Sequence, residues 1–553
     1  MRDDHLRGIA RRQRHAELAA GFRWDVPETF NFGTDVVDAW AAERDGLALI
    51  WENAAGDAAS FRYSDMARLS SRMASALARE GVGKGDRVIV MLPRIPEWQI
   101  ALVACLKIGA IAIPAIEMLT ARDITYRVRN AEAKAFICRG EQVGKLAEAA
   151  GEVPVRIAVG GAPGWIDWEA ALTAGTEDYA AARVAAEDPV LMYYTSGSTG
   201  HPKGVLHAAR ALYAWRMQAY MWLDLEPDDR IWCTADTGWS KAGTSVIWGP
   251  WSAGACAFFY DGPFVPVNRL RLLDKHRITV FCASGTEILR LVNESIGAYD
   301  LAALRRTVSA GEAMSPAAAE RWQAATGSLV AEAYGQTEAL MMVLNYPSEP
   351  VRLGSMGRPQ PGLDIDIVDD AGVRQPVGAE GHVALLTPSP QLMLGYWKDP
   401  ERTTQCFTDG PDGRWYLSGD RGTKDADGYL WYAGRADDVI NSAGYRIGPL
   451  EVENALLEHK AVQECAVVPS PDTERGEVVK AFVVLREGFA GDAALVTELQ
   501  DHVKSVTAPY KYPRRIEFVA EIPKTVTGKI RRRTLRDLET ERARGSGHDS
   551  RRR

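Results

Sequence analysis

A run of ten residues gives this chain its clearest candidate site for chemistry. Residues 195–204 read Thr-Ser-Gly-Ser-Thr-Gly-His-Pro-Lys-Gly and follow an apolar, strand-like run. Small residues let main-chain N–H groups gather around anionic oxygens, hydroxyls add donors, and Lys203 adds charge. The common G-x-x-x-x-G-K-[ST] loop is excluded, because Pro202 and Gly204 stand where it needs Gly and Ser or Thr. The run therefore predicts another kind of phosphate-binding loop, between a strand and a helix over about residues 208–223.

Two shorter motifs combine acidic, hydroxyl and aromatic groups. Tyr334-Gly-Gln-Thr-Glu338 offers a ring that can stack on adenine, a hydroxyl for an α-phosphate oxygen, and a carboxylate that suits Mg²⁺. Tyr416-Leu-Ser-Gly-Asp420 puts a carboxylate on a tight turn, where it can accept hydrogen bonds from ribose hydroxyls. Each motif alone is also typical of an ordinary turn.

Two further motifs lie nearer the C-terminus. The first joins Gly434-Arg-Ala-Asp-Asp438 to Ser442-Ala-Gly-Tyr-Arg-Ile-Gly448, and the second is Pro523-Lys-Thr-Val-Thr-Gly-Lys529. A lysine beside a glycine in a flexible loop can carry a movable positive charge. Lys524 in the same loop is an alternative, but the glycine–lysine pairing favours Lys529.

In this order the five motifs resemble the signature of the adenylate-forming superfamily, which comprises acyl-CoA synthetases, luciferases and amino-acid adenylation domains. The resemblance covers nearly the whole chain. It is strongest to medium-chain acyl-CoA synthetases of the mitochondrial type and their bacterial relatives, whose segments the runs 30–35 and 502–514 also resemble.

The resemblance implies a role for each matching residue. Nucleotide contacts are implied for Thr195, Ser196, Gly197, Ser198, Thr199, Gly200, Lys203, Gly311, Glu312, Glu332, Ala333, Tyr334, Gly335, Gln336, Thr337, Asp420, Arg435 and Lys529. Catalytic roles are implied for Lys529, Thr337 and Glu338, with Glu338 also holding Mg²⁺. CoA contacts are implied for Ala443, Gly444, Tyr445, Arg475, Lys504, Tyr512, Pro513 and Arg514. Acyl contacts are implied for Trp239, Lys241, Gly335 and Arg446, and a hinge at Asp437.

The implied reaction is an ATP-dependent, AMP-forming ligation of a carboxylic acid to CoA. In the first step the carboxylate attacks the α-phosphorus of ATP and pyrophosphate departs, which needs alignment and charge neutralisation more than proton transfer. In the second step the CoA sulfur attacks the acyl-adenylate and AMP leaves. A small domain that turns about Asp437 would present Lys529 for one step and the CoA contacts for the other. Regulation by a lysine acetyltransferase acting on Lys529 is also implied.

The sequence predicts the reaction type, but it leaves the identity of the acyl substrate open. Acetate-using relatives carry a tryptophan at the position of Gly335, so this glycine is expected to leave room for a medium-chain, branched, cyclic or aromatic acyl group. Trp239, Met341 and Met342 could line that space or simply pack in the core, and Lys241 could meet a polar group or face solvent.

The surrounding pattern indicates an α/β protein that positions these motifs. Apolar strand-like runs alternate with helical stretches over about residues 60–340, which predicts largely parallel sheets. Short strands and frequent Gly and Pro over about 350–433 indicate a β-rich subdomain. We therefore predict a large domain over 1–434, hinged to a small α+β domain over 435–553, with a disordered tail from Glu541.

Composition excludes several other classes of protein. The 553 residues include 65 Lys and Arg and 73 Asp and Glu, a net charge of −8 that argues against a general nucleic-acid binder. The seven scattered cysteines indicate buried, reduced thiols, and no apolar run is long enough to span a membrane. The first residues are rich in arginine but also acidic and without serine, which indicates a solvated helical arm and a cytoplasmic protein.

Three alternative functions remain open on sequence alone. The chain could adenylate an acid for a carrier protein, act as a non-catalytic nucleotide sensor, or carry a luciferase-like side activity. The CoA-like contacts disfavour the first alternative, and the retained Lys203, Glu338, Asp420, Arg435 and Lys529 disfavour the second.

Overall fold

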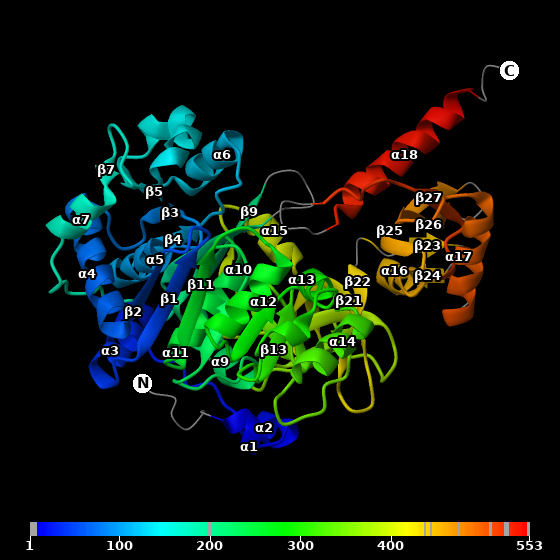
Figure 1. Ribbon diagram of the computed structural model, residues 1–553, viewed down its shortest axis with the longest axis horizontal. Coiled ribbons are helices and arrows are strands. Elements are labelled where there is room, and N and C mark those ends of the chain that lie inside the picture. The colour runs from blue at the N-terminus through cyan, green and yellow to red at the C-terminus, as the bar shows by residue number, and fades with distance from the viewer. Residues whose placement is uncertain are drawn as a thin grey trace. The chain divides into compact units, whose positions relative to one another are not determined.

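Figure 1 shows the computed structural model, which describes residues 8–195, 202–312, 314–435, 438, 440–442, 445–472, 476–507, 511–524 and 530–549. The chain divides into two compact units. The first comprises Met1–Ile365 and Leu386–Phe407, and the second comprises Asp366–Leu385 and Thr408–Arg553. The predicted division at 434/435 concerns a hinge, and it stays a prediction.

A mixed sheet runs through the first unit. Its strands within this unit follow one another in the order β16 (Ser355–Pro359), β15 (Leu340–Leu344), β14 (Val330–Gln336), β13 (Arg306–Ala310), β12 (Val280–Ala283), β10 (Arg230–Cys233), β11 (Cys256–Asp261), β1 (Leu47–Asn53) and β2 (Ala58–Arg62). The strands from β14 to β1 are parallel to one another, and the pairs β1–β2, β14–β15 and β15–β16 are antiparallel.

Helices cover both faces of this sheet. Because successive strand residues point to opposite faces, Trp232, Phe258 and Phe281 enter one apolar cluster, while neighbouring residues such as Ile231 and Cys282 enter another. The first cluster also takes side chains from α12 (Pro266–Lys275), α13 (Gly285–Leu291) and α14 (Pro316–Thr326), and the second takes them from α8 (Ala209–Trp215), α9 (Met217–Met221) and α11 (Gly249–Ser252).

A second sheet in the same unit has the strand order β19 (Gly395–Tyr396), β9 (Lys203–Ala208), β8 (Pro189–Thr195), β4 (Ile111–Pro114), β3 (Arg87–Met91), β5 (Ala135–Arg139), β6 (Val155–Val159) and β7 (Ile166–Asp167). One of its faces contributes to the same core as the first sheet, together with α3 (Ala39–Glu43), α4 (Tyr63–Arg79), α5 (Pro96–Ile108) and α7 (Trp168–Ala174). The other face packs against α6 (Ala121–Ala131) and the 3₁₀ segment 140–152.

Helix α5 shows how local sequence sets these elements. It begins with Pro96 at its first position, where no hydrogen-bond donor is lost, and it ends at Ile108, followed by Gly109, whose φ of 77° terminates the helix. Every residue from Trp98 to Ile108 is buried, including Lys107, whose Nζ lies 2.7 Å from Asp38 Oδ1. A helix that is apolar on nearly all sides belongs inside the core.

The second unit contains a β-rich part and a smaller α+β part. Strands β17 (Ile365–Val368), β18 (Gly381–Leu386), β21 (Gly413–Lys424) and β22 (Leu430–Arg435) follow one another, and β20 (Phe407–Gly410) pairs with β21. The smaller sheet has the order β24 (Tyr445–Ile447), β23 (Ile440–Ser442), β26 (Gly476–Leu485) and β25 (Val462–Asp472), with β27 (Arg515–Phe518) beside β26.

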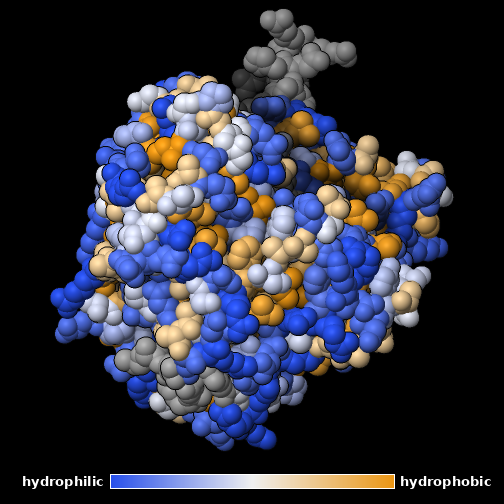
Figure 2. Space-filling view, turned by 60° about the vertical axis from the view of Figure 1, so that its left-hand side comes forward, coloured by the Kyte–Doolittle hydropathy of each residue, from blue (hydrophilic) through white to orange (hydrophobic). Residues whose placement is uncertain are grey.

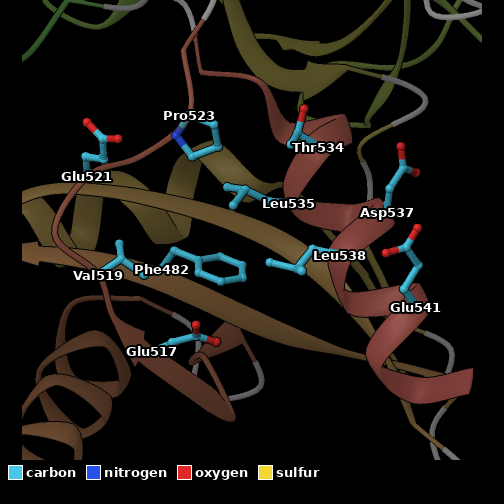
Figure 3. Close-up of a pocket in the computed structure, with 10 residues that line it drawn as sticks. All are labelled: Phe482, Glu517, Val519, Glu521, Pro523, Thr534, Leu535, Asp537, Leu538 and Glu541. Carbon is cyan, nitrogen blue, oxygen red and sulfur yellow. The ribbon is translucent and has the colours of Figure 1, made fainter. Parts of the chain in front are cut away.

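Two faces of the smaller sheet are covered by different helices. Val467 packs with α16 (Pro449–Leu457) and α17 (Ala493–Val506), whereas Val468 and Phe482 pack with Leu535 of α18 (Arg532–Asp549). Figure 3 shows Leu535 and Leu538 facing Phe482 and Val519 across a cavity of about 500 Å³. The chain beyond Glu541, predicted to be disordered, continues as helix to Asp549 and runs out past the sheet (Figure 1).

The predicted α/β class, with its β-rich stretch and small α+β part, is confirmed, but two further details differ. Strand β9 lies between the predicted phosphate loop and the helix that was expected to follow it directly. The N-terminal arm forms α1 (Ile9–Arg12) and α2 (His15–Gly21), and it is docked rather than solvated. Its Arg11 Nε lies 2.7 Å from Asp224 Oδ1, and the His15 ring packs edge-on against Tyr346.

Surface and cysteine content fit the expectations from composition. Hydrophilic side chains cover most of the face in Figure 2, with hydrophobic ones in small groups between them. All seven cysteines are free thiols, and only Cys406 is partly exposed. Among the residues described, no helix is long and apolar enough to cross a membrane.

Candidate active site

The carboxyl ends of β12, β13 and β14 meet at one edge of the first sheet. Parallel strands that share a direction bring the residues after them together, and such edges are common ligand sites in α/β proteins. Lys241, in the short helix α10 (Ser240–Ala242), marks this edge. Its Nζ donates to the main-chain oxygens of Ala283, at 3.2 Å, and Ala310, at 3.0 Å. Lys241 is therefore half-buried over the strand ends rather than pointed into solvent.

A tight hairpin presents Thr337 and Glu338 at the same edge. Strand β14 ends at Gln336 and β15 begins at Leu340, whose φ of 53° is unusual for leucine and closes a three-residue turn. The Thr337 Oγ1 lies 3.3 Å from Ser240 Oγ, so the turn reaches the segment that carries Lys241. The motif thus places a hydroxyl and a carboxylate on a rigid turn.

The Glu338 carboxylate is buried and paired with a lysine from the other sheet. Lys203 Nζ lies 2.9 Å from Glu338 Oε1 and 2.6 Å from the Tyr396 hydroxyl, which in turn donates to the same Oε1 at 2.8 Å. We refer to these three groups as the Lys203–Glu338–Tyr396 triangle. Burial alone would raise the pKa of Glu338, but the Lys203 charge and the two hydrogen bonds together hold this pKa below its ordinary value.

A buried histidine holds the turn that carries Thr337 and Glu338. His207, on β9, is fully buried, and its Nε2 donates to the main-chain oxygen of Thr337 at 2.8 Å. Burial lowers the pKa of His207 from 6.5 to about 4, so the imidazole is neutral at pH 7 and can serve as this donor. His207 and Tyr396 were missed by the sequence reasoning, since neither lies at a spacing that marks a motif.

Gly335 has a structural reason to be glycine, apart from its predicted acyl contact. The strand pairing shifts between Tyr334 and Gly335, and a Cβ built at 335 would overlap the main-chain oxygen of Leu340. The glycine is therefore required by the irregular hairpin. Any side chain at 335 must displace β15 in this backbone, and the effect of a tryptophan there on an acyl pocket stays a prediction.

Further residues predicted to contact the nucleotide or the acyl group follow the same strands of the first unit. Glu312 accepts a hydrogen bond from the main-chain N–H of Thr286, and Gly311 has a φ of 92°. Ala333 is buried, whereas Tyr334, Gln336 and Trp239 are half-buried. Their contacts with a nucleotide or an acyl group stay predictions.

Glu332 differs from these residues because its carboxylate is hydrogen-bonded to the main chain. It is buried and accepts hydrogen bonds from the N–H groups of Met314, at 3.0 Å, and Gly354, at 3.2 Å. Burial raises the pKa of Glu332 to about 7. These bonds give the carboxylate a structural function, so a nucleotide contact by Glu332 stays a prediction.

The predicted phosphate loop connects two antiparallel strands. Thr195 ends β8 and pairs with Lys203, the first residue of β9, so the loop is closed at its base by a hairpin. The Thr195 hydroxyl is buried and has no hydrogen-bond partner among the residues described. Five predicted phosphate contacts lie outside the described residues, namely Ser196, Gly197, Ser198, Thr199 and Gly200.

The predicted ribose site lies in the second unit. Asp420 and Arg435 face each other across β21 and β22, and Arg435 Nη1 donates to Asp420 Oδ1 at 3.1 Å. Tyr432 donates to the same oxygen at 3.4 Å. Gly419 has a φ of 74°, which only glycine adopts easily, and this turn brings Arg435 close.

Three predicted CoA contacts come together in the second unit. Lys504 Nζ lies 4.5 Å from the centre of the Tyr512 ring, and the Arg514 guanidinium lies 5.0 Å from it. Arg514 also donates to the Tyr512 hydroxyl at 3.0 Å, while the neighbouring Pro513 is buried. Two cations around one aromatic ring suit a ligand that carries both phosphates and a base.

Several predicted residues lie outside the described part of the chain. These are Lys529, Asp437, Ala443, Gly444 and Arg475, together with the side chains of Tyr445 and Arg446. Their roles, and the predicted action of an acetyltransferase on Lys529, stay predictions.

The Glu338 environment fits a magnesium ion as a partner. Both hydrogen bonds that Glu338 receives end on Oε1, and Mg²⁺ commonly takes one or two carboxylates and completes its shell with water and phosphates. In the described residues no group of three or more acidic, histidine or cysteine side chains is placed to form an all-protein metal site. A magnesium ion here would therefore depend on the phosphates of a nucleotide.

Comparison with known proteins identifies the family. Residues 37–397 match the AMP-binding enzyme model, and residues 451–529 match the AMP-binding enzyme C-terminal domain. The chain belongs to the AMP-binding enzyme family, so the predicted resemblance is confirmed.

Individual relatives cover almost the whole chain. It is 40% identical over 537 residues to acyl-coenzyme A synthetase ACSM4, mitochondrial, of Rattus norvegicus, covering 94% of this chain and 92% of the relative. It is 39% identical over 544 residues to the human acyl-coenzyme A synthetase ACSM3, mitochondrial, covering 95% and 92%. The crystal structure of the anthranilate CoA ligase AuaEII with anthranoyl-AMP matches with a TM-score of 0.84 at 30% identity, covering 93% and 98%.

The predicted cytoplasmic location is wrong by this comparison, because both curated relatives are named as mitochondrial. The prediction rested on the acidic, serine-free composition of the first residues. Targeting signals are addresses read by receptors, and local composition is a weak guide to them.

A substitution of Gly335 tests the role given to the irregular hairpin. Gly335→Ala is expected to lower the free energy of unfolding by about 1–3 kcal/mol, because its Cβ overlaps the Leu340 main chain. Gly144→Ala is the matched control, since its Cβ meets nothing within 4 Å. Thermal unfolding of both variants measures the difference, and equal midpoints would show that the hairpin tolerates a side chain at 335.

The buried His207 predicts a specific pH dependence. Its folded pKa lies below its unfolded value, so its contribution to stability is complete above pH 6.5 and is lost as the pH falls toward 4. The difference between 6.5 and about 4 corresponds to about 3 kcal/mol. His207→Gln keeps a donor for the Thr337 oxygen but does not titrate.

The measurement is the stability of the wild type minus that of His207→Gln, from pH 7 to pH 4. The subtraction is needed because Glu332, with its raised pKa, stabilises the fold as the pH falls through the same range. We expect the difference to fall by about 3 kcal/mol. A difference that does not change with pH would show that His207 is not buried in neutral form.

Proposed function

We propose that this protein is an acyl-CoA synthetase that joins a carboxylic acid to CoA through an acyl-adenylate, with release of pyrophosphate and then AMP. The observation that carries this proposal is the Lys203–Glu338–Tyr396 triangle beside Thr337, in a chain of the AMP-binding enzyme family. A cation, a hydroxyl and a buried carboxylate at the end of parallel strands suit a triphosphate and its magnesium ion.

In the first step an oxygen of the substrate carboxylate attacks the α-phosphorus, and the bond to the pyrophosphate oxygen breaks. Lys203 neutralises the charge that grows on the departing pyrophosphate, and the Thr337 hydroxyl donates to an α-phosphate oxygen. A Mg²⁺ ion held on Glu338 would add positive charge at the phosphates. Lys529 supplies a further cation when the small domain presents it.

In the second step the CoA sulfur attacks the acyl carbon, and the bond from that carbon to the AMP oxygen breaks. Lys504, Tyr512 and Arg514 hold the phosphates and adenine of CoA, while Asp420 and Arg435 bind the ribose of the nucleotide. The change between the two steps is a rotation about Asp437.

The acyl group occupies the strand-end region beside Trp239, and it is a medium-chain, branched, cyclic or aromatic acid. The similarity to a ligase that acts on anthranilate supports an aromatic acid as one member of this class. The backbone at Gly335 offers no support for a preference by chain length, so Trp239 and Met341 are the residues on which the preference depends.

A panel of carboxylic acids in a pyrophosphate-release assay tests the function. We expect release that depends on the acid, with a thioester formed when CoA is added. Release without an acid, or transfer to a carrier protein in preference to CoA, would contradict the proposal.

Lys529→Ala separates the two half-reactions. We expect the rate of acyl-adenylate formation to fall by about 10²–10³-fold, the size of effect that follows loss of a charge aimed at the transition state. Thioester formation from supplied acyl-adenylate should change by less than about threefold, because Lys529 acts only in the first step. Lys524→Ala is the matched control for a cation near the same segment. Equal loss of both half-reactions in Lys529→Ala would refute the assignment.

A further inference from the structure

Tyr396 belongs to the triangle but has no role in the two proposed reaction steps. It lies on the two-residue strand β19 and is buried, and its hydroxyl is held between Lys203 and Glu338. The hydroxyl accepts from the lysine and gives its single proton to the carboxylate. The Lys203 ammonium also lies 4.1 Å from the centre of the Tyr396 ring.

Within the triangle, the Glu338 carboxylate is paired with the Lys203 ammonium and hydrogen-bonded to Tyr396. Glu338 is only 8% exposed, and a buried carboxylate needs a cation or strong hydrogen bonds to remain ionised. Lys203 supplies the cation in this structure. When a triphosphate takes the Lys203 ammonium, the carboxylate loses that partner while it remains buried.

We propose that Tyr396 is a positioning residue that keeps Glu338 hydrogen-bonded while Lys203 moves from the carboxylate onto the β- and γ-phosphates of ATP. This inference rests on the proposed function, because it places ATP at this site. Tyr396 lowers the cost of releasing Lys203, since its hydroxyl remains a donor to Oε1 after the ammonium has left. Without the hydroxyl, the lysine would stay on the carboxylate and ATP would compete for it poorly.

A comparison of ATP binding with AMP binding distinguishes the positioning role of Tyr396 from a merely structural role. AMP has no β- or γ-phosphate, so its binding does not require Lys203 to leave Glu338. ATP binding does require that exchange. A variant that only loosens the fold would weaken both nucleotides together.

The test measures the affinities of ATP and AMP by titration calorimetry at one fixed Mg²⁺ concentration. Tyr396→Phe removes the hydroxyl and keeps the ring. We expect its ATP affinity to fall by about 10- to 100-fold, the loss associated with one hydrogen bond to a charged group, and its AMP affinity to change by less than about twofold. Tyr63→Phe is the control, because Tyr63 is also a buried tyrosine whose hydroxyl donates, here to the Ala255 main-chain oxygen.

A second variant keeps the test sharp if Tyr396→Phe is less stable than the wild type. Lys203→Met removes the ammonium, so adding Tyr396→Phe to it should lower ATP affinity by less than about a further twofold. Equal loss of ATP and AMP affinity in Tyr396→Phe, or additive effects of the two substitutions, would overturn the role of Tyr396. Failure of the wild type to bind either nucleotide would instead contradict the proposed function.

Discussion

One buried negative charge at a hairpin turn organises this active site. Glu338 cannot remain ionised inside the protein without partners, and each partner comes from a distant part of the chain. Strand β9 must run past the turn to supply Lys203, and it carries His207, which holds the Thr337 oxygen. Strand β19 must pair with β9 to supply Tyr396. This carboxylate therefore joins the two sheets of the first unit at the turn, in addition to the apolar core that the sheets share.

The same arrangement explains why the site can handle a triphosphate. Lys203 is paired with Glu338 within the triangle, and a triphosphate can take the place of this carboxylate. The second unit carries cations of a different kind, with Lys504 and Arg514 around the Tyr512 ring and Arg435 against Asp420. Each unit thus carries an acid–cation pair and a cation beside an aromatic ring, which suits two successive steps on different phosphate groups.

The fold class and several charged residues of the candidate site could be predicted from sequence, because the residue types in a motif indicate which groups they can bind. Lys203, Glu338 and Asp420 were proposed that way, Arg435 was proposed from the family resemblance, and the alternation of strands and helices predicted the fold class. His207 and Tyr396 were missed because they act on a distant turn through tertiary pairing, which leaves no local pattern. The structural need for Gly335 was missed for a related reason, since the sequence does not show that the Leu340 main chain lies against this glycine.

The central claim is that the acid is activated by attack of its own oxygen on the α-phosphorus. A carboxylic acid labelled with ¹⁸O in both carboxylate oxygens, together with ATP and CoA, tests this most directly by mass spectrometry of the products. We expect AMP to carry one ¹⁸O atom per turnover and pyrophosphate to carry none. Label in pyrophosphate or inorganic phosphate, or unlabelled AMP, would contradict it.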